Sequence, residues 1–267
     1  ILHCFFFLLG MLFLPLFLLF VWMLSVIPAP SQDDIIARAP RLPMTNTDKK
    51  NVFRKYGWGL LCFIILYTFL ATLRDFRDNF TVEIWSEIDP GWDKNVFTQT
   101  EAITSVIVLA VIGSLSVIKN NFRGFWVVNG IIGIGFMITA LATFLFQRHA
   151  ISPFWWMLLL GTGLFLAYMP MQIALFERLI AHFRITANAG FFVYLCDSIG
   201  YMGSVLLLLY KEFFMEKMSW SLVLMKFTYL QAAISLVLLA GACVFFYRSA
   251  VQKKKAAAPV QVALSEV

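Results

Sequence analysis

Asp197 is the residue with the clearest chemical potential, because it is a carboxylate inside an otherwise apolar stretch at 189–210. If a helix begins near Asn188, Asp197 lies roughly 14 Å along it at 1.5 Å per residue. That depth is close to the centre of a bilayer, where a charged side chain costs about 2.5 to 3.5 kcal/mol on insertion scales. We therefore expect the carboxylate to face a cavity or a polar partner, and a carboxyl that gains and loses a proton is what proton-coupled transport requires.

The tyrosines around Asp197 leave a second role open. Tyr194 and Tyr201 each lie one helical turn from Asp197, on the same face. They are candidates for the same proton-coupling site. Alternatively, Asp197 is a structural carboxyl that is hydrogen-bonded to one of these two hydroxyls.

A second charged group, Arg74-Asp75-Phe76-Arg77-Asp78, directly follows an apolar stretch. Arg74 and Asp78 are spaced i to i+4, and Arg74 and Arg77 i to i+3, so the three share one helical face. If that face turns inward, the arginines can bind an anionic group of a substrate through two N–H groups. If it turns outward, the side chains extend to the membrane interface and pair there. Gln172, just after Pro170 in a predicted kinked helix, is a further candidate to line a pore.

Seven long apolar stretches must position these residues. They lie at 1–27, 57–73, 102–118, 125–146, 153–176, 189–210 and 222–247. Most approach or exceed the roughly 18 apolar residues with which a helix crosses about 30 Å of hydrocarbon. They are apolar on all sides, whereas a helix of a soluble domain has one apolar stripe. The pattern predicts an all-α, polytopic membrane protein with seven transmembrane helices. We therefore expect the lipid bilayer to be a partner of this protein.

Composition supports this class and excludes others. The chain is 61% hydrophobic and only 13% charged, far from the averages of soluble domains. The four cysteines fall inside apolar stretches, and the three histidines are scattered, so we predict no metal site and no cofactor. No spacing of residues suggests a catalytic arrangement, and we do not expect an enzyme.

Basic residues are shared unevenly between the two sets of loops that seven crossings would separate. The segments 28–56, 119–123, 177–187 and 248–267 hold 14 of the 21 Lys and Arg residues. By the positive-inside rule this set is cytoplasmic, which places the C-terminus inside. The segment 28–56 is then a cytoplasmic linker, 57–247 a six-helix transmembrane bundle and 248–267 a basic cytoplasmic tail. Positive charge placed in this way predicts contact with anionic lipid and not with nucleic acid.

One helix, a basic linker, six helices and a basic tail resemble the last seven helices of a twelve-helix major facilitator superfamily transporter. In that superfamily two six-helix halves are joined by a long cytoplasmic loop. The resemblance implies that 1–27 corresponds to the sixth helix and 57–247 to the C-terminal half. The chain begins with Ile1 and has no initiator Met, so the N-terminal helices of the same protein are an expected partner.

Two local segments carry a narrower resemblance. The runs FERLIA at 176–181, NAGFF at 188–192 and YLCDSIGYMGS at 194–204, together with RDFRDNF at 74–80, are similar to a bacterial branch of the superfamily known only as a domain of unknown function. The loop signature Gly-x-x-x-Asp-Arg-x-x-Arg of the superfamily is reduced here to KNNFR at 119–123. The resemblance implies transport in a bacterial inner membrane and names no substrate.

Two functions follow as hypotheses. The first is a secondary, proton-coupled transporter of a small polar or anionic solute, with Asp197 and Arg74 in its central site. The second is a non-transporting member of the same fold that acts as a membrane sensor or assembly partner. The two differ in whether Asp197 and Arg74 face one cavity.

Overall fold

The computed structural model describes residues 2–29, 32, 44–185, 187–214 and 219–265, and all regular secondary structure in this part of the chain is helical. The chain divides into two units, Ile1–Pro40 and Arg41–Val267. The first unit contains α1 (Leu2–Ser25). Its apolar part with described side chains, Gly10–Ser25, is shorter than the 18 residues of a candidate span. The predicted crossing by 1–27 therefore stays a prediction.

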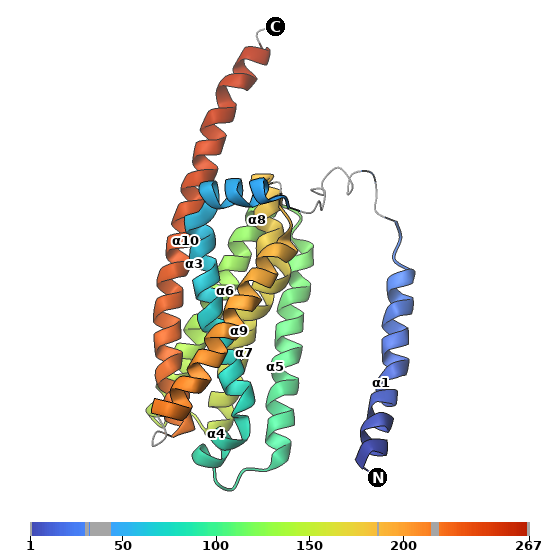
Figure 1. Ribbon diagram of the computed structural model, residues 1–267, viewed down its shortest axis with the longest axis vertical. Helices are drawn as coiled ribbons and strands as arrows, with labels where there is room; N and C mark the ends of the chain where they lie inside the picture. Colours follow the sequence, from blue (N-terminus) through green and yellow to red (C-terminus); the bar gives the residue numbers. More distant parts are fainter. Residues whose placement is uncertain (1, 30–31, 33–43, 186, 215–218, 266–267) are drawn as a thin grey trace. The chain divides into compact units, whose positions relative to one another are not determined.

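The second unit contains six described helices that are long and apolar enough to cross a membrane. They are α3 (Asn46–Asn79), α5 (Lys94–Ser114), α6 (Asn121–Gln147), α7 (Pro153–Pro170), α9 (Ala189–Phe214) and α10 (Trp220–Ser265). Figure 1 shows them running side by side as a bundle. The shorter elements are α4 (Thr81–Ile88), η1 (Leu115–Val117), η2 (Met171–Leu175) and α8 (Phe176–Phe183). The six apolar stretches predicted between residues 57 and 247 are thus confirmed as long helices, compatible with an integral membrane protein.

Helix α3 begins at Asn46, well before the stretch predicted from residue 57. The reason is a capping box: the Thr45 hydroxyl accepts a hydrogen bond from the Asp48 N–H at 3.2 Å, and the Asp48 carboxylate accepts one from the Thr45 N–H at 3.0 Å. The end of the predicted linker 28–56 is therefore helical. Most of its remainder, residues 30–31 and 33–43, lies outside the described residues. Likewise, α10 extends through most of the predicted tail 248–267, as far as Ser265.

A π-helical turn interrupts the path from α7 to α8. Pro170 ends α7, and η2 follows at once. Proline has no N–H to donate and its ring crowds the preceding turn, so the regular hydrogen-bond ladder cannot continue through it. The kink predicted beside Pro170 thus takes the form of a π turn, a feature often found at functional sites. Gln172 lies within that turn.

Helix α3 is central to the bundle because it packs against α7, α9 and α10. Helices α6 and α7 approach closely at two glycines: a Cβ atom built on Gly135 would lie 2.5 Å from the Gly163 carbonyl oxygen. Small residues permit such close contact between helix backbones. By contrast, most side chains of α5 and α9 are at least partly exposed in this bundle.

Candidate functional site

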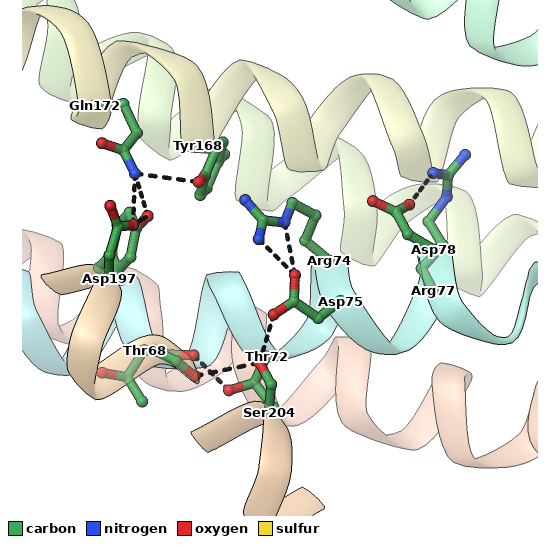
Figure 2. A network of polar contacts seen from close by, with 12 residues as sticks. Thr68, Thr72, Arg74, Asp75, Arg77, Asp78, Tyr168, Gln172, Asp197 and Ser204 are labelled. Atoms are coloured by element: carbon green, nitrogen blue, oxygen red, sulfur yellow. Dashed lines mark hydrogen bonds and ion pairs between the residues drawn. The ribbon is translucent and has the colours of Figure 1, made fainter. Parts of the chain in front are cut away.

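Asp197 on α9 lies in a hydrogen-bonded group with side chains from two other helices. The Tyr67 hydroxyl on α3 donates a hydrogen bond to Asp197 Oδ1, and Gln172 Nε2 on η2 donates to the same oxygen at 2.8 Å (Figure 2). Gln172 Nε2 also lies within hydrogen-bond reach of the Tyr67 hydroxyl and, at 3.1 Å, of the Tyr168 hydroxyl. An amide carries only two N–H groups, so these three acceptors compete for them. The group therefore has more than one possible hydrogen-bond arrangement.

The partners of Asp197 differ from the ones the sequence suggested. Tyr194 and Tyr201 are 75% and 62% exposed, and the hydrogen bonds to Asp197 come from α3 and η2 instead. At about 100° per residue, the two tyrosines lie roughly 40 to 60° further round α9 than Asp197 does. Asp197 thus stands at the edge of the buried face, and both tyrosines lie further towards the exposed side of the helix. Pairing of Asp197 with either of them was wrong.

Arg74 forms an ion pair with the adjacent Asp75, which the predicted face of Arg74, Arg77 and Asp78 did not include. Arg74 Nε lies 2.9 Å from Asp75 Oδ1, and a second N–H group of Arg74 donates to the same oxygen. The guanidinium carbon also stands over the Tyr168 ring, 4.2 Å from its centroid. On α9, the Ser204 hydroxyl donates to Asp75 Oδ2 at 2.7 Å. Contacts with α7 and α9 therefore orient the pair, which helical spacing within α3 does not reveal.

Arg77 has a separate place. Its side chain is 2% exposed, and it pairs with Asp78 at 2.9 Å and with Glu101 on α5. A Cβ atom on Gly161 of α7 would lie 2.6 Å from Arg77 Nη2, so a larger residue there would require the guanidinium to shift. A buried charge needs such partners to be tolerated. Arg77 thus connects α3 with α5 and lies against α7, outside the Asp197 group.

Tyr168 joins the two groups around Arg74 and Asp197. Its hydroxyl accepts from Gln172, and its ring faces the Arg74 guanidinium. A polar chain consequently runs from Ser204 through Asp75, Arg74, Tyr168 and Gln172 to Asp197, as Figure 2 shows. On α3 it extends from Tyr67 to Arg74, roughly 10 Å at 1.5 Å per residue.

Sequence reasoning did not assign Tyr67, Tyr168 or Ser204 to this chain, and it named Asp75 only as part of the charged group at 74–78. Tyrosines in apolar helices are common at lipid interfaces and give no clear signal. One signal was available: Tyr67 and Arg74 are seven residues apart, two helical turns, and so share a face of α3.

A pocket of about 430 Å³ lies between the C-terminal part of α3 and α9. Its polar lining consists of Arg74, Asp75, Asn79, Tyr201 and Ser204. The structure thus brings Arg74 and Tyr201 to one cavity. Asp197 and Gln172 do not line it, and their connection to it runs through Tyr168 and Arg74.

Another polar contact joins α4, which is not one of the membrane-compatible helices, to the first residues of α10. Glu87 on α4 accepts hydrogen bonds at 2.8 Å from the N–H groups of Trp220 and Ser221 and from the Ser221 hydroxyl, and so caps α10. Partial burial raises the pKa of Glu87, but the hydrogen bonds from Ser221 and Trp220 together lower it below its ordinary value.

The described residues contain no group of three His, Cys, Asp or Glu side chains that would hold a metal ion.

The described part of the chain defines a class: an all-helical protein in which six apolar helices of membrane-spanning length are described, with a chain of polar side chains between some of them. Residues 3–249 match the model of a family of unknown function, DUF5690. The chain therefore belongs to that family. No curated protein and no solved structure matches the chain.

Proposed function

We propose that this protein is a proton-coupled secondary transporter of a small polar or anionic solute. The observation that carries the proposal is the hydrogen-bonded group of Asp197, Tyr67 and Gln172, held between apolar helices. Such a group has a cost in an apolar environment, and intramembrane carboxylates of this kind commonly mark proton or substrate pathways. The pocket beside Arg74 and Asp75 supplies a place for the solute.

A proton on Asp197 would change the whole polar chain. A charged carboxylate only accepts hydrogen bonds, whereas a protonated one also donates. Protonation would thus free the Tyr67 hydroxyl or the Gln172 amide to find other acceptors, and Tyr168 is already within reach of that amide. Because Tyr168 also faces Arg74, this rearrangement couples the proton to the charged pair beside the pocket.

Placement in the membrane is part of the proposal. We place the basic ends of the helices and the C-terminus in the cytoplasm, α1 as a seventh span, and the protein in a bacterial inner membrane, with the arrangement of the last seven helices of a major facilitator transporter. The 14 basic residues of one loop set, against seven in the other, support this orientation.

One observation favours the second candidate, a non-transporting sensor or assembly partner. Helix α9 exposes Tyr194, Ser198 and Tyr201 on one side. Polar aromatic side chains on such a face suit contact with another protein element as well as with a solute. Under this alternative the Asp197 group would only hold α3, α9 and η2 together.

The experiment is uptake by the full-length protein in proteoliposomes, with and without an imposed pH gradient, over a panel of labelled amino acids, carboxylates and sugar phosphates. Asp197→Asn keeps the size of the side chain but cannot titrate. It should abolish gradient-driven accumulation and leave solute exchange largely intact. Asp89→Asn, in the exposed loop after α4, is the matched control. Accumulation by the Asp197→Asn protein in response to the gradient would contradict the coupling role, and absence of any uptake by the unmodified protein would favour the sensor.

A further inference from the structure

The pocket between α3 and α9 presents a positive and a negative charge side by side. Arg74 and Asp75 both line it, and their side chains are 17% and 16% exposed. The two charges are paired with each other, so the pocket has no net charge from this pair. A solute that enters must therefore interact with both charges at once.

Each partner of the pair has hydrogen-bonding capacity left. Arg74 directs two of its five N–H groups to Asp75 Oδ1. Asp75 Oδ2 accepts the Ser204 hydroxyl, and a carboxylate oxygen can accept more than one hydrogen bond. Both groups can thus begin to bind a ligand before they separate.

We propose that this pocket binds a small zwitterion of the α-amino acid type, an inference that rests on the transport function proposed above. A simple anion would take Arg74 from Asp75 and leave a partly buried carboxylate without its cation, which is strongly unfavourable. A simple cation would strand Arg74 in the same way. A zwitterion exchanges one ion pair for two, with its carboxylate on Arg74 and its ammonium group on Asp75. Because Arg74 and Asp75 are in contact, the two ligand charges must be close together, as on the single carbon of an α-amino acid.

The rest of the pocket suits an apolar side chain on such a ligand. Its other lining includes Phe76, Phe80, Val205 and Leu208. The volume of about 430 Å³ falls in the usual range for sites of small ligands. Charged groups would bind at the pair, and the ligand side chain would contact this apolar surface.

The test compares each L-amino acid that has an uncharged side chain with its N-acetyl derivative, which is only an anion, and with its amide, which is mainly a cation. Binding to the purified full-length protein in detergent is measured by calorimetry at pH 7. At least one amino acid should bind at least about tenfold more tightly than both of its derivatives, because only the zwitterion leaves no charge unpaired. If an N-acetyl derivative binds as tightly as its parent, or if no amino acid binds, the inference is overturned.

Two variants provide reciprocal signatures. Asp75→Asn removes the carboxylate that an anion would strand, so the preference over the N-acetyl derivative should fall to within about threefold. Arg74→Gln should instead reduce the preference over the amide. Asp89→Asn should change neither ratio. Unchanged ratios in folded Asp75→Asn and Arg74→Gln proteins would also overturn the inference.

The outcome is separable from that of the transport proposal. Gradient-driven uptake of an anion that is sensitive to Asp197→Asn would support the transport proposal and overturn the inference of a zwitterionic ligand. Binding of a zwitterion without any uptake would support the assignment of the pocket and overturn the transport proposal.

Discussion

The side-chain amide of Gln172 donates a hydrogen bond to the Asp197 carboxylate at 2.8 Å, across the boundary between η2 and α9. Gln172 lies two residues after Pro170, in a turn where the regular α-helical ladder is broken. The break that proline imposes on the backbone thus coincides with the polar contact of this partly buried carboxylate (Figure 2). A local backbone irregularity and the candidate proton site belong to one structural feature.

Tyr67→Phe tests whether Asp197 depends on its tyrosine partner. The change removes the hydroxyl that donates to Asp197 Oδ1 and leaves the ring, which faces Tyr168. We expect gradient-driven uptake to fall by at least about tenfold with little change in protein yield. Tyr229→Phe, which removes a hydroxyl bonded to Gln147 outside this group, is the control. Gradient-driven uptake that survives Tyr67→Phe unchanged would show that Asp197 does not depend on this hydroxyl.

Arg74→Lys tests the geometry of the charged pair. An ammonium group cannot donate two N–H groups in the fixed geometry of a guanidinium or stack on the Tyr168 ring in the same way. The KM for uptake should rise about tenfold, since each lost charge-assisted hydrogen bond contributes about 1.5 to 3 kcal/mol. Arg148→Lys is the matched control, because the Arg148 guanidinium also stands over an aromatic ring, that of Phe144. A KM that survives Arg74→Lys unchanged supports an interface role for Arg74.

Gly135→Ala tests the close contact between α6 and α7. The added methyl group would lie 2.5 Å from the Gly163 carbonyl oxygen, which is backbone and cannot rotate away. We expect a loss of about 1 to 3 kcal/mol in stability and a lower midpoint of thermal unfolding in detergent. Gly130→Ala on the same helix meets nothing within 4 Å and should leave stability unchanged or raise it by up to about 1 kcal/mol. Equal midpoints for the two variants would contradict this close approach of the two helices.

The pKa of Glu87 predicts how the stability of the folded protein changes with pH. Its folded-state pKa lies below its ordinary value of 4.5, so the protein releases the Glu87 proton more readily when folded. The stabilisation is present above pH 4.5 and is lost as pH falls through the folded-state pKa. Glu87→Gln should therefore lower the thermal midpoint at pH 7, and the difference from the unmodified protein should shrink below about pH 4. Glu83→Gln, exposed on the same helix, is the control. A difference that grows on acidification would refute the assigned sign.

The proposed orientation predicts opposite labelling at the two ends of α3. Thr45 caps the helix at its start, and Asp89 follows α4. Single cysteines at these positions, in a protein without the native cysteines, should react differently with an impermeant maleimide in intact cells. We expect labelling at 89 and not at 45. The reverse pattern would place the C-terminus outside.

The amino-acid sequence by itself determined where the long apolar helices lie and which residues are candidates for the functional site. Long runs of apolar residues specify membrane-compatible helices because no other single element satisfies its own backbone in an apolar solvent. Asp197 and Gln172 were recognisable for the same reason, since a polar side chain in such a run is costly and needs a partner. Arg74 was recognisable because its charged group directly continues an apolar run.

Only the tertiary structure decided which partners these residues have. Helical spacing pointed from Asp197 to Tyr194 and Tyr201, but the contacts are with Tyr67 and Gln172 on other helices. The same holds for Arg74, which pairs with Asp75 because Tyr168 and Ser204 orient the two side chains from α7 and α9. Spacing along one helix fixes only the face of a residue, whereas the identity of its neighbour depends on how the helices pack against one another.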